Sequence, residues 1–240
     1  MDFEYSAECI PGPGCPSSWF EEELQGCSCE DQCTSTSGCS CLLGAEDNYS
    51  SEKIYEEKLS GAPVIECGEN CRCLSNCANR MLQHGITLKL EVFVHQNGKG
   101  FGVRAAELIK RGSFVCQYAG EIIGKEEVEL RATTRRFHNY VFTVKEHCNG
   151  DTNFTYIDPK YRGNLARFIN HSCEPNLLIV PVRVSRPVPL IGLFASRDID
   201  IGEELSYDYG LPEQMNNLKK CLCGTASCRG YLPTTITASE

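Results

Sequence analysis

The sequence RFINHSCEPN, residues 167–176, carries more polar chemistry than an ordinary connecting segment. Within ten residues it holds a cation, an amide, an imidazole, a thiol and a proline. Pro175 cannot continue a helix, and Ser172 and Asn176 lie on either side of it. We therefore predict a short helix or 3₁₀ turn that ends at Ile169 before the chain doubles back. The segment is either a helix end with an incidental cysteine or a binding loop.

Two stretches further along the chain favour the binding loop. The first is EELSYDYG, residues 203–210, and the second is CLCGTASC, residues 221–228. In this order, the three stretches resemble the SET domain of protein-lysine methyltransferases, with its Asn-His-Ser-Cys loop, its Glu-Leu-x-Tyr-Asp-Tyr strand and its post-SET cysteine triplet. Long, ordered motifs that lie far apart seldom agree by chance. The resemblance extends from Cys27 to Cys228.

Short apolar runs separated by glycine and proline predict a mainly β fold of small sheets with short helices, rather than a doubly wound sheet. From Ile86 to Val94 apolar residues alternate with mostly polar ones, which predicts a half-buried strand, and Asn97-Gly98 predicts a hairpin turn after it. The other predicted strands are residues 114–118, 140–144, 177–184, 190–195 and 204–207. Helical segments are predicted at residues 19–25, 54–59 and 125–137.

The resemblance implies an architecture that the residue pattern alone does not give. SET domains thread their C-terminal segment under a loop as a pseudoknot, within a β-fold of small sheets. Three regions are implied: an N-terminal lead-in with a pre-SET zinc cluster at residues 1–86, the SET catalytic domain at 87–211, and a post-SET zinc motif with a tail at 212–240.

Cysteine is unusually frequent, with 17 residues, and about two-thirds of them lie in the first third of the chain. The count is odd and many of the thiols are close together, so metal binding is favoured over a disulfide-rich secreted domain. The densest group contains nine cysteines: Cys27, Cys29, Cys33, Cys39, Cys41, Cys67, Cys71, Cys73 and Cys77.

Nine thiolates fit two tetrahedral zinc sites with one cysteine to spare, or three sites if three cysteines each bridge two metals. The count and spacing resemble the pre-SET module of SET enzymes associated with heterochromatin, which implies the three-zinc cluster. Cys221, Cys223 and Cys228 lack a fourth ligand, and Cys173 is the candidate for it, so one more zinc is expected in the post-SET site. The remaining thiols are assigned to the core or the surface: Cys9, Cys15, Cys116 and Cys148.

The chain has a formal net charge of −9, with 32 acidic and 23 basic side chains. Such a balance disfavours direct nucleic-acid binding and favours a cationic peptide, so a histone tail or nucleosome is the expected substrate. The sequence holds no stretch of 18 apolar residues and does not open on a basic and apolar leader, so we expect neither a membrane segment nor secretion. The expected location is the nucleus, on chromatin. No oligomeric state is indicated.

The segment GKGFG, residues 98–102, is glycine-rich but lacks the spacing of a dinucleotide-binding loop, and no long helix follows it. Alone it predicts a plain hairpin. The resemblance implies instead that its backbone approaches S-adenosylmethionine, with Phe101 where many family members have tryptophan. For Asn139 and Tyr140 an ordinary strand pair is the alternative to cofactor binding. The residues implied at the cofactor are Lys99, Gly100, Phe101, Asn139, Tyr140, Arg167, Asn170, His171 and Leu222.

Four aromatic residues match the family's lysine channel: Tyr118, Phe142, Tyr207 and Tyr209. A lysine amine has a pKa near ~10.4, so only about one in a thousand is neutral at physiological pH, and a narrow apolar channel lowers that pKa. The resemblance implies that Tyr209 is the catalytic tyrosine, whose hydroxyl orients the amine. A core tyrosine at a strand end is the alternative. Tyr207 stands where family members carry Phe or Tyr, and its hydroxyl implies mono- and dimethylation.

These observations predict an S-adenosylmethionine-dependent histone-lysine methyltransferase that acts on the histone H3 tail. The alternative is a chromatin- or histone-binding module that keeps the fold and has lost turnover. A binding module has no physical need for the full set of expected catalytic and cofactor residues, which favours the enzyme. The set is Tyr118, Arg167, Asn170, His171 and Tyr209.

Overall fold

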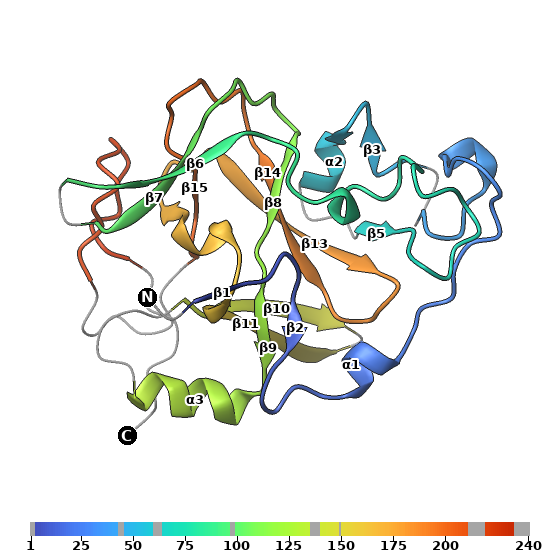
Figure 1. Cartoon of the computed structure of the whole chain (residues 1–240), viewed down its shortest axis with the longest axis horizontal. Coiled ribbons are helices and arrows are strands. Elements are labelled where there is room, and N and C mark those ends of the chain that lie inside the picture. Colours follow the sequence, from blue (N-terminus) through green and yellow to red (C-terminus); the bar gives the residue numbers. More distant parts are fainter. Residues whose placement is uncertain are drawn as a thin grey trace.

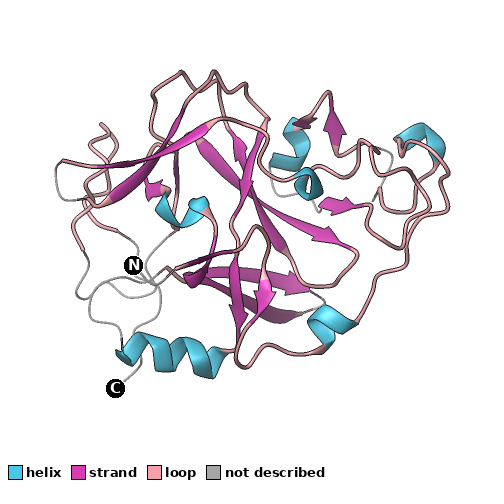
Figure 2. Ribbon diagram, in the orientation of Figure 1, coloured by secondary structure: helices cyan, strands magenta, loops and turns pink. Residues whose placement is uncertain are grey.

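The computed structural model describes residues 3–42, 46–59, 64–96, 99–134, 140–148, 150–210 and 219–232. Short strands dominate these residues, and the helices are short (Figure 1, Figure 2). The mainly β fold expected from the sequence is therefore confirmed.

The helices are α1 (Ser18–Glu21), α2 (Glu56–Leu59) and α3 (Lys125–Thr134), and the 3₁₀ turns are η1 (Ser35–Ser37), η2 (Leu82–His84) and η3 (Leu165–Phe168). The strands of the first half are β1 (Glu4–Tyr5), β2 (Ile10–Pro11), β3 (Tyr49–Ser50), β4 (Lys53–Ile54), β5 (Val64–Glu66), β6 (Leu90–Val94), β7 (Phe101–Ala105), β8 (Phe114–Gln117) and β9 (Gly120–Ile123). Those of the second half are β10 (Phe142–Cys148), β11 (Asp151–Gly163), β12 (Asn170–His171), β13 (Leu177–Val184), β14 (Leu190–Ala195) and β15 (Ser206–Tyr207).

Strands that are distant in sequence share the two larger sheets. One sheet has the order β1-β11-β9-β2, with β10 also pairing with β11, and the other has the order β5-β13-β14-β8. Two-stranded sheets are formed by β3 with β4, β6 with β7, and β12 with β15. The early strands β1 and β2 join β11 and β9 in parallel, and β5 from the cysteine-rich region joins β13 in parallel (Figure 1).

The main core is shared by the two larger sheets. Ile122 of β9 and Leu193 of β14 are fully buried in it. The same cluster continues to Ile169 and Leu205, which directly precede β12 and β15, and it ends at the ring of Tyr207. Because close packing fixes the strands that carry them, side chains at this edge of the core are held in defined positions.

Most of the predicted elements are present, some with shifted ends. Residues 177–184 and 190–195 form β13 and β14 with the predicted bounds, and α3 covers most of the predicted helix at 125–137. The prediction for residues 86–94 is wrong in part, because β6 begins only at Leu90. Val92 and Val94 are 42% and 66% exposed, since β6 lies in a two-stranded sheet rather than over the core. Residues 97–98 and 135–137 lie outside the described residues.

The longest strand, β11, was not expected from the sequence, since it is polar and contains Pro159. Pairing with β10 along its first half and with β9 further on keeps it extended. Its fully buried Asp158 accepts a hydrogen bond at 2.7 Å from Arg131 of α3, which also pairs with Glu121 of β9 at 2.9 Å. This ion network fixes α3 to the sheet.

The pairing of β12 with β15 joins the two sequence motifs. The strands run in parallel, with Asn170 opposite Ser206 and His171 opposite Tyr207. The turn η3 directly precedes β12 and ends with Ile169 as its C-cap, which confirms the predicted 3₁₀ turn. This pairing is the contact that the expected pseudoknot requires. No helix among the described residues is long and apolar enough to cross a membrane.

Candidate active site

Buried hydrogen bonds hold the two motifs against each other. The Ser172 N–H donates to the Tyr207 carbonyl at 3.2 Å. The side chain of Asn176, which is buried, donates through Nδ2 to the Glu204 carbonyl at 2.9 Å and accepts through Oδ1 from the Ser206 N–H at 2.8 Å. A buried donor or acceptor that loses its partner costs about 1–3 kcal/mol. The loop and the strand therefore form one rigid platform.

The four rings expected to form the lysine channel lie together. Ring centroids are 4.7 Å apart for Tyr207 and Tyr209, and 5.3 Å apart for Tyr118 and Phe142. Tyr207 lies 6.1 Å from each ring of the second pair. Tyr118 and Tyr207 are almost fully buried, whereas Tyr209 is 38% exposed. The cluster thus runs from the core to the surface and offers apolar walls to a slender side chain.

The tyrosine hydroxyls of this cluster are oriented by backbone carbonyls. The Tyr118 hydroxyl donates to the Tyr140 carbonyl at 2.7 Å, and the Tyr209 hydroxyl donates to the Ile169 carbonyl at 2.8 Å. Burial raises the pKa of Tyr118, Tyr207 and Tyr209 above the ordinary value. The phenols therefore stay neutral at physiological pH and can orient an amine without adding charge to the channel.

Asn170 links the glycine-rich loop to the motif strand. Its Nδ2 donates to the Phe101 carbonyl at 3.0 Å and to Glu204 Oε1 at 2.9 Å. The same carboxylate oxygen lies 2.9 Å from His95 Nε2. Gly100 has a φ of +90°, which favours glycine, and a Cβ there would meet nothing within 4 Å. The loop is thus fixed at Phe101, with open space beside Gly100 for a ligand.

Arg167 is a buried cation beside these residues, with only 8% of its surface exposed. Its guanidinium carbon lies 4.4 Å from the ring centroid of Phe3, 4.8 Å from that of Tyr140 and 5.1 Å from that of Phe168. Its Nε and Nη1 are buried and have no acceptor in the part of the chain that the structure describes. Buried donors need a partner, so these two groups fit a ligand with acceptor atoms, such as the expected S-adenosylmethionine.

The other residues expected at the cofactor differ in their surroundings. Phe101 and Leu222 are 38% and 49% exposed, so both side chains are accessible to a ligand. The Phe101 ring lies 5.2 Å from the Phe168 ring. Lys99 directly precedes Gly100 in the loop, and Asn139 lies outside the described residues.

His171 connects the motif strand to a group of cysteines. The Tyr209 N–H donates to His171 Nδ1 at 3.2 Å, and His171 Nε2 lies 3.3 Å from Cys173 Sγ and 3.4 Å from Arg229 Nη2. Burial lowers the pKa of His171 against the opposing effect of Asp208. The imidazole ring therefore links the backbone of the expected catalytic tyrosine to the cysteine group.

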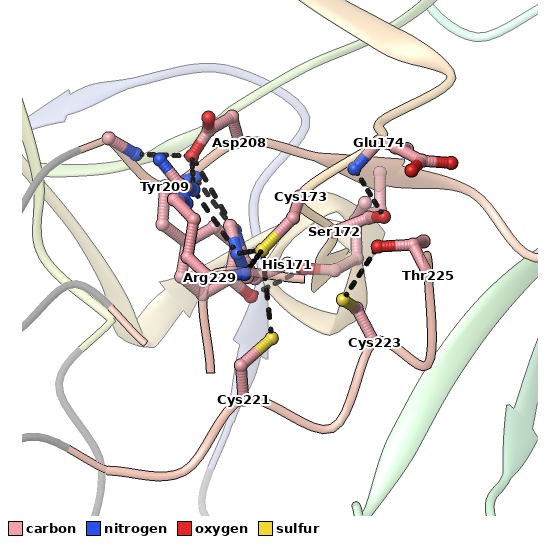
Figure 3. Close-up of polar contacts among 12 residues, drawn as sticks. His171, Ser172, Cys173, Glu174, Asp208, Tyr209, Cys221, Cys223, Thr225 and Arg229 are labelled. Atoms are coloured by element: carbon pink, nitrogen blue, oxygen red, sulfur yellow. Dashed lines mark hydrogen bonds and ion pairs between the residues drawn. The ribbon is translucent and has the colours of Figure 1, made fainter. Parts of the chain in front are cut away.

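Cys173, Cys221, Cys223 and Cys228 bring four sulfur atoms within 4.8 Å of one another, so Cys173 completes the predicted post-SET set. Figure 3 shows three of these residues, Cys173, Cys221 and Cys223. Burial raises the pKa of Cys223, but hydrogen bonds, chiefly from the Thr225 hydroxyl, outweigh it and lower this pKa to about 5. Four thiols in this arrangement suit a structural zinc site.

Three polar contacts clamp the same segment onto the motifs, and Figure 3 shows the pair of Arg229 with Asp208. Arg229 Nη2 donates to Asp208 Oδ1 at 2.6 Å, and the Arg229 N–H donates to Cys173 Sγ at 3.3 Å. The Ser227 N–H donates to Glu174 Oε1 at 3.0 Å. The post-SET segment is thus tied both to the loop after His171 and to the residue before Tyr209.

The nine cysteines of the pre-SET region converge in the same way. Three groups of four sulfur atoms, each within 4.8 Å, overlap in their members. Cys41 Sγ lies 3.6 Å from Cys71 Sγ, and the Cys33 N–H donates to Cys77 Sγ at 3.4 Å, so these thiols join the groups. Burial and the neighbouring thiol of Cys39 raise the pKa of Cys33 far above its usual range. Only bound cations would keep such crowded sulfurs ionised, so the donor set fits zinc.

Several residues of the site were missed by sequence reasoning. His95, Glu204 and Asn176 support the Asn170 loop, Phe3 lies on Arg167, and Asp208 pairs with the post-SET segment; none of these was assigned a role. Glu204, Asp208 and Asn176 stand inside the motifs, which is the one signal that could have drawn attention to them. His95 and Phe3 carry no such signal.

Comparison with known families and proteins agrees with this geometry. Residues 100–210 match the SET domain, and residues 1–80 match the Pre-SET motif. The chain is similar to the probable histone-lysine N-methyltransferase set-23 of Caenorhabditis elegans, with 45% identity over 246 residues that cover 100% of both chains.

Solved structures give the same result. The methyltransferase domain of human histone-lysine N-methyltransferase SETMAR has 37% identity and a TM-score of 0.84, over 97% of this chain and 90% of that one. The motifs also resemble the methyltransferase region of the vertebrate SET domain/mariner transposase fusion protein, and this match confirms that narrower resemblance. KRYPTONITE, in complex with mCHH DNA, an H3(1-15) peptide and SAH, has 32% identity and a TM-score of 0.80, over 96% of this chain and 48% of that one.

Proposed function

The chain belongs to the SET-domain histone-lysine methyltransferases, and from this premise we propose that it transfers methyl groups from S-adenosylmethionine to a lysine of the histone H3 tail. The observation that carries the proposal is the ring cluster of Tyr118, Phe142, Tyr207 and Tyr209 directly beside the Asn170-His171 strand. A substrate lysine amine held in the ring cluster would therefore lie next to a methyl donor bound at the strand.

The ring cluster prepares the amine. Apolar walls penalise an ammonium ion, so they favour loss of its proton to water before transfer. The Tyr209 hydroxyl, held at the Ile169 carbonyl, orients the neutral amine. The cofactor supplies an electrophilic methyl group, and the chain's part is to place the amine in line with it.

We assign binding of the methyl donor chiefly to residues whose hydrogen-bond donors lack an acceptor in the described part of the chain or whose side chains are exposed. Arg167 offers its Nε and Nη1, and Asn170 holds the loop that carries Lys99, Gly100 and Phe101. Asn139, Tyr140, His171 and Leu222 complete the proposed set. The solved structures of KRYPTONITE and of Arabidopsis thaliana SUVH6 are complexes with SAH and SAM, which supports the same cofactor here.

We propose three zinc ions in the pre-SET cluster and one in the post-SET site. In the cluster, Cys27 belongs to all three groups of four sulfur atoms, and Cys33, Cys39 and Cys67 belong to two each, so we propose that the three bridging ligands come from these four cysteines. We keep residues 1–86, 87–211 and 212–240 as the corresponding regions.

The H3 tail is proposed on charge and on one relative. A chain with a net charge of −9 attracts a lysine- and arginine-rich peptide and offers little affinity to nucleic acid. The KRYPTONITE structure contains an H3(1-15) peptide, which supports the same class of substrate. On this proposal the enzyme works on chromatin in the nucleus, with the histone tail or the nucleosome as its partner.

Mono- and dimethylation is the proposed outcome. Tyr207 is 4% exposed, and its ring contacts both Tyr118 and Phe142. A hydroxyl in so confined a place occupies the volume that a third methyl group needs.

Mass spectrometry tests the proposal. Incubated with S-adenosylmethionine, the protein is expected to add methyl groups to H3 tail peptides, to histones or to nucleosomes. Tyr209→Phe is expected to lower the rate at least about a hundredfold, because it removes the hydroxyl that orients the amine. Tyr55→Phe, in the exposed pre-SET region, is the matched control and should keep the wild-type rate.

Protein that binds the H3 peptide and the cofactor yet transfers no methyl group to any of these substrates would contradict the proposal. That result would instead support the histone-binding module.

A further inference from the structure

The segment before the cysteine-rich region docks next to the candidate donor site. Strand β1 pairs in parallel with the end of β11, with Glu4 opposite Arg162 and Tyr5 opposite Gly163 (Figure 1). The Ser6 N–H donates to the Gly163 carbonyl at 2.7 Å, and Glu4 pairs with Arg162 at 2.9 Å. The turn η3, which carries Arg167, follows this strand end directly. Residues 3–6 are therefore fixed against the element that holds the buried cation.

Phe3 makes the shortest of the three ring contacts of Arg167. Its ring centroid lies 4.4 Å from the guanidinium carbon, against 4.8 Å for Tyr140 and 5.1 Å for Phe168. The Phe3 and Phe168 rings also meet edge to face at 6.2 Å. A cation within about 6 Å of a ring face is attracted by it, and more strongly when water is excluded. Three rings thus hold one guanidinium group in place.

These rings fix the cation without using its hydrogen-bonding capacity. Nε and Nη1 of Arg167 are buried and lack an acceptor among the described residues, although the side chain is only 8% exposed. A ring face attracts a cation but is a poor acceptor, so both N–H groups keep their full capacity. The row of rings continues from Phe168 to Phe101, 5.2 Å away, in the glycine-rich loop.

We infer that Phe3 is a positioning residue for Arg167, and that β1 thereby forms one wall of the methyl-donor site. The inference rests on the proposed function, since it concerns how that function's cofactor is held. Phe3 keeps water away from the guanidinium group and limits its rotation, so that Nε and Nη1 face the donor. Phe3 itself acts only through Arg167.

A substitution series at Phe3 tests this role. Phe3→Ala and Phe3→Leu are expected to raise the KM for S-adenosylmethionine about tenfold, while kcat stays within about twofold, because the contact contributes to binding and not to the transfer. Leucine keeps apolar bulk but has no ring face, so it separates the cation–ring contact from packing. Phe3→Trp should have a KM equal to or below that of the wild type, because a tryptophan ring attracts a cation more strongly than a phenylalanine ring.

Tyr5→Ala is the matched control, since Tyr5 lies on the same strand and is 62% exposed. Its KM should equal that of the wild type. Thermal unfolding of every variant should stay within about 2 °C of the wild type, which would show that no variant acts through loss of the fold. In addition, Phe3→Ala should have little further effect in an Arg167→Met background, because a neutral side chain leaves no cation for the ring to hold.

Three outcomes would overturn the inference in an active wild-type protein: an unchanged KM in Phe3→Ala, a wild-type KM in Phe3→Leu, or full additivity with Arg167→Met. Calorimetric titration of the wild type with S-adenosylmethionine separates these outcomes from a failure of the proposed function. No binding to the wild type refutes the proposed function itself, whereas equal binding to wild type and Phe3→Ala refutes only the role of Phe3.

Discussion

Tyr207 and Tyr209 are two residues apart but have different surroundings. Tyr207 is 4% exposed and interacts through its hydroxyl with Tyr118, whereas Tyr209 is 38% exposed and donates to the Ile169 carbonyl. Burial raises the pKa of both phenols, so both are neutral when the enzyme works. On the proposed function, the Tyr207 hydroxyl therefore acts through its volume and its hydrogen bond, whereas the Tyr209 hydroxyl orients the amine.

Replacing the buried hydroxyl should change the product. Tyr207→Phe frees space and removes a polar group, so the fraction of trimethylated lysine should rise at least about tenfold, the scale of discrimination that one small group provides in a pocket. The first methylation should keep a rate within about threefold of the wild type. Time-resolved mass spectrometry of an H3 peptide checks this, and an unchanged distribution of products would contradict it.

Individual site residues could be predicted from the sequence where the residue type or its spacing is unusual. Clustered cysteines and closely spaced tyrosines stand out in a sequence, and the structure places Cys173 and Tyr118 with the partners expected of them. His95 was not predictable, because its contact with Glu204 joins residues 109 positions apart and neither residue type is unusual. The contact of Phe3 with Arg167 was missed for the same reason.

At the level of elements, the post-SET segment is held by more than its cysteines. Arg229 pairs with Asp208, and Ser227 contacts Glu174, so both sides of the His171 loop are clamped. The Arg229 side chain is about a quarter exposed. Solvent therefore weakens the pair only in part, and its loss should loosen the segment that carries Leu222.

Arg229→Gln should release the clamp while leaving the backbone N–H on Cys173. We expect the KM for S-adenosylmethionine to rise about fivefold, and zinc to leave the four-cysteine site faster when it is challenged with a chromogenic chelator. Arg104→Gln is the control, since Arg104 pairs with Glu91 across the two-stranded sheet of β6 and β7 and both side chains are exposed. Equal zinc release from both variants would refute the role of Arg229.

Elements were predictable where local pattern and tertiary context agree. β13 and β14 are apolar, bounded by turn residues and central in their sheet, so their bounds were correct. β11 was missed because its extended form depends on β9 and β10. The half-buried face predicted from residue 86 onward is correct up to Leu90, which packs against the core, and wrong at Val92 and Val94, because alternation does not reveal where the strand leaves the core. Sheet partners are not encoded in local periodicity.

For the whole molecule, the cysteine cluster of the pre-SET region has almost no apolar core of its own. Its buried residues are seven cysteines and Leu42. Such a cluster cannot offset chain entropy by apolar burial, so we expect folding there to require metal. Strand β5 of this region pairs in parallel with β13, with Val64 opposite Val182. Unfolding of the region would therefore also remove an edge strand from the sheet of β13, β14 and β8.

Removal of zinc by a strong chelator should therefore unfold the pre-SET region and abolish methyl transfer. We expect the midpoint of thermal unfolding to fall by more than about 10 °C, because metal-binding free energy is folding free energy in such modules. Circular dichroism and metal analysis follow the change, and re-addition of zinc under reducing conditions is the control. Full activity in protein shown to be free of zinc would contradict the expectation.

The order of strands also limits how this protein can be recombined. β1 and β2 precede the cysteine cluster in sequence yet complete the sheet of β11 and β9, which follow it. A recombination point between the cysteine cluster and β9 would separate β9 and β11 from β1 and β2, which belong to the same sheet. A gene that acquires this catalytic unit therefore keeps the sheet complete only if it takes β1 and β2 together with β9 and β11.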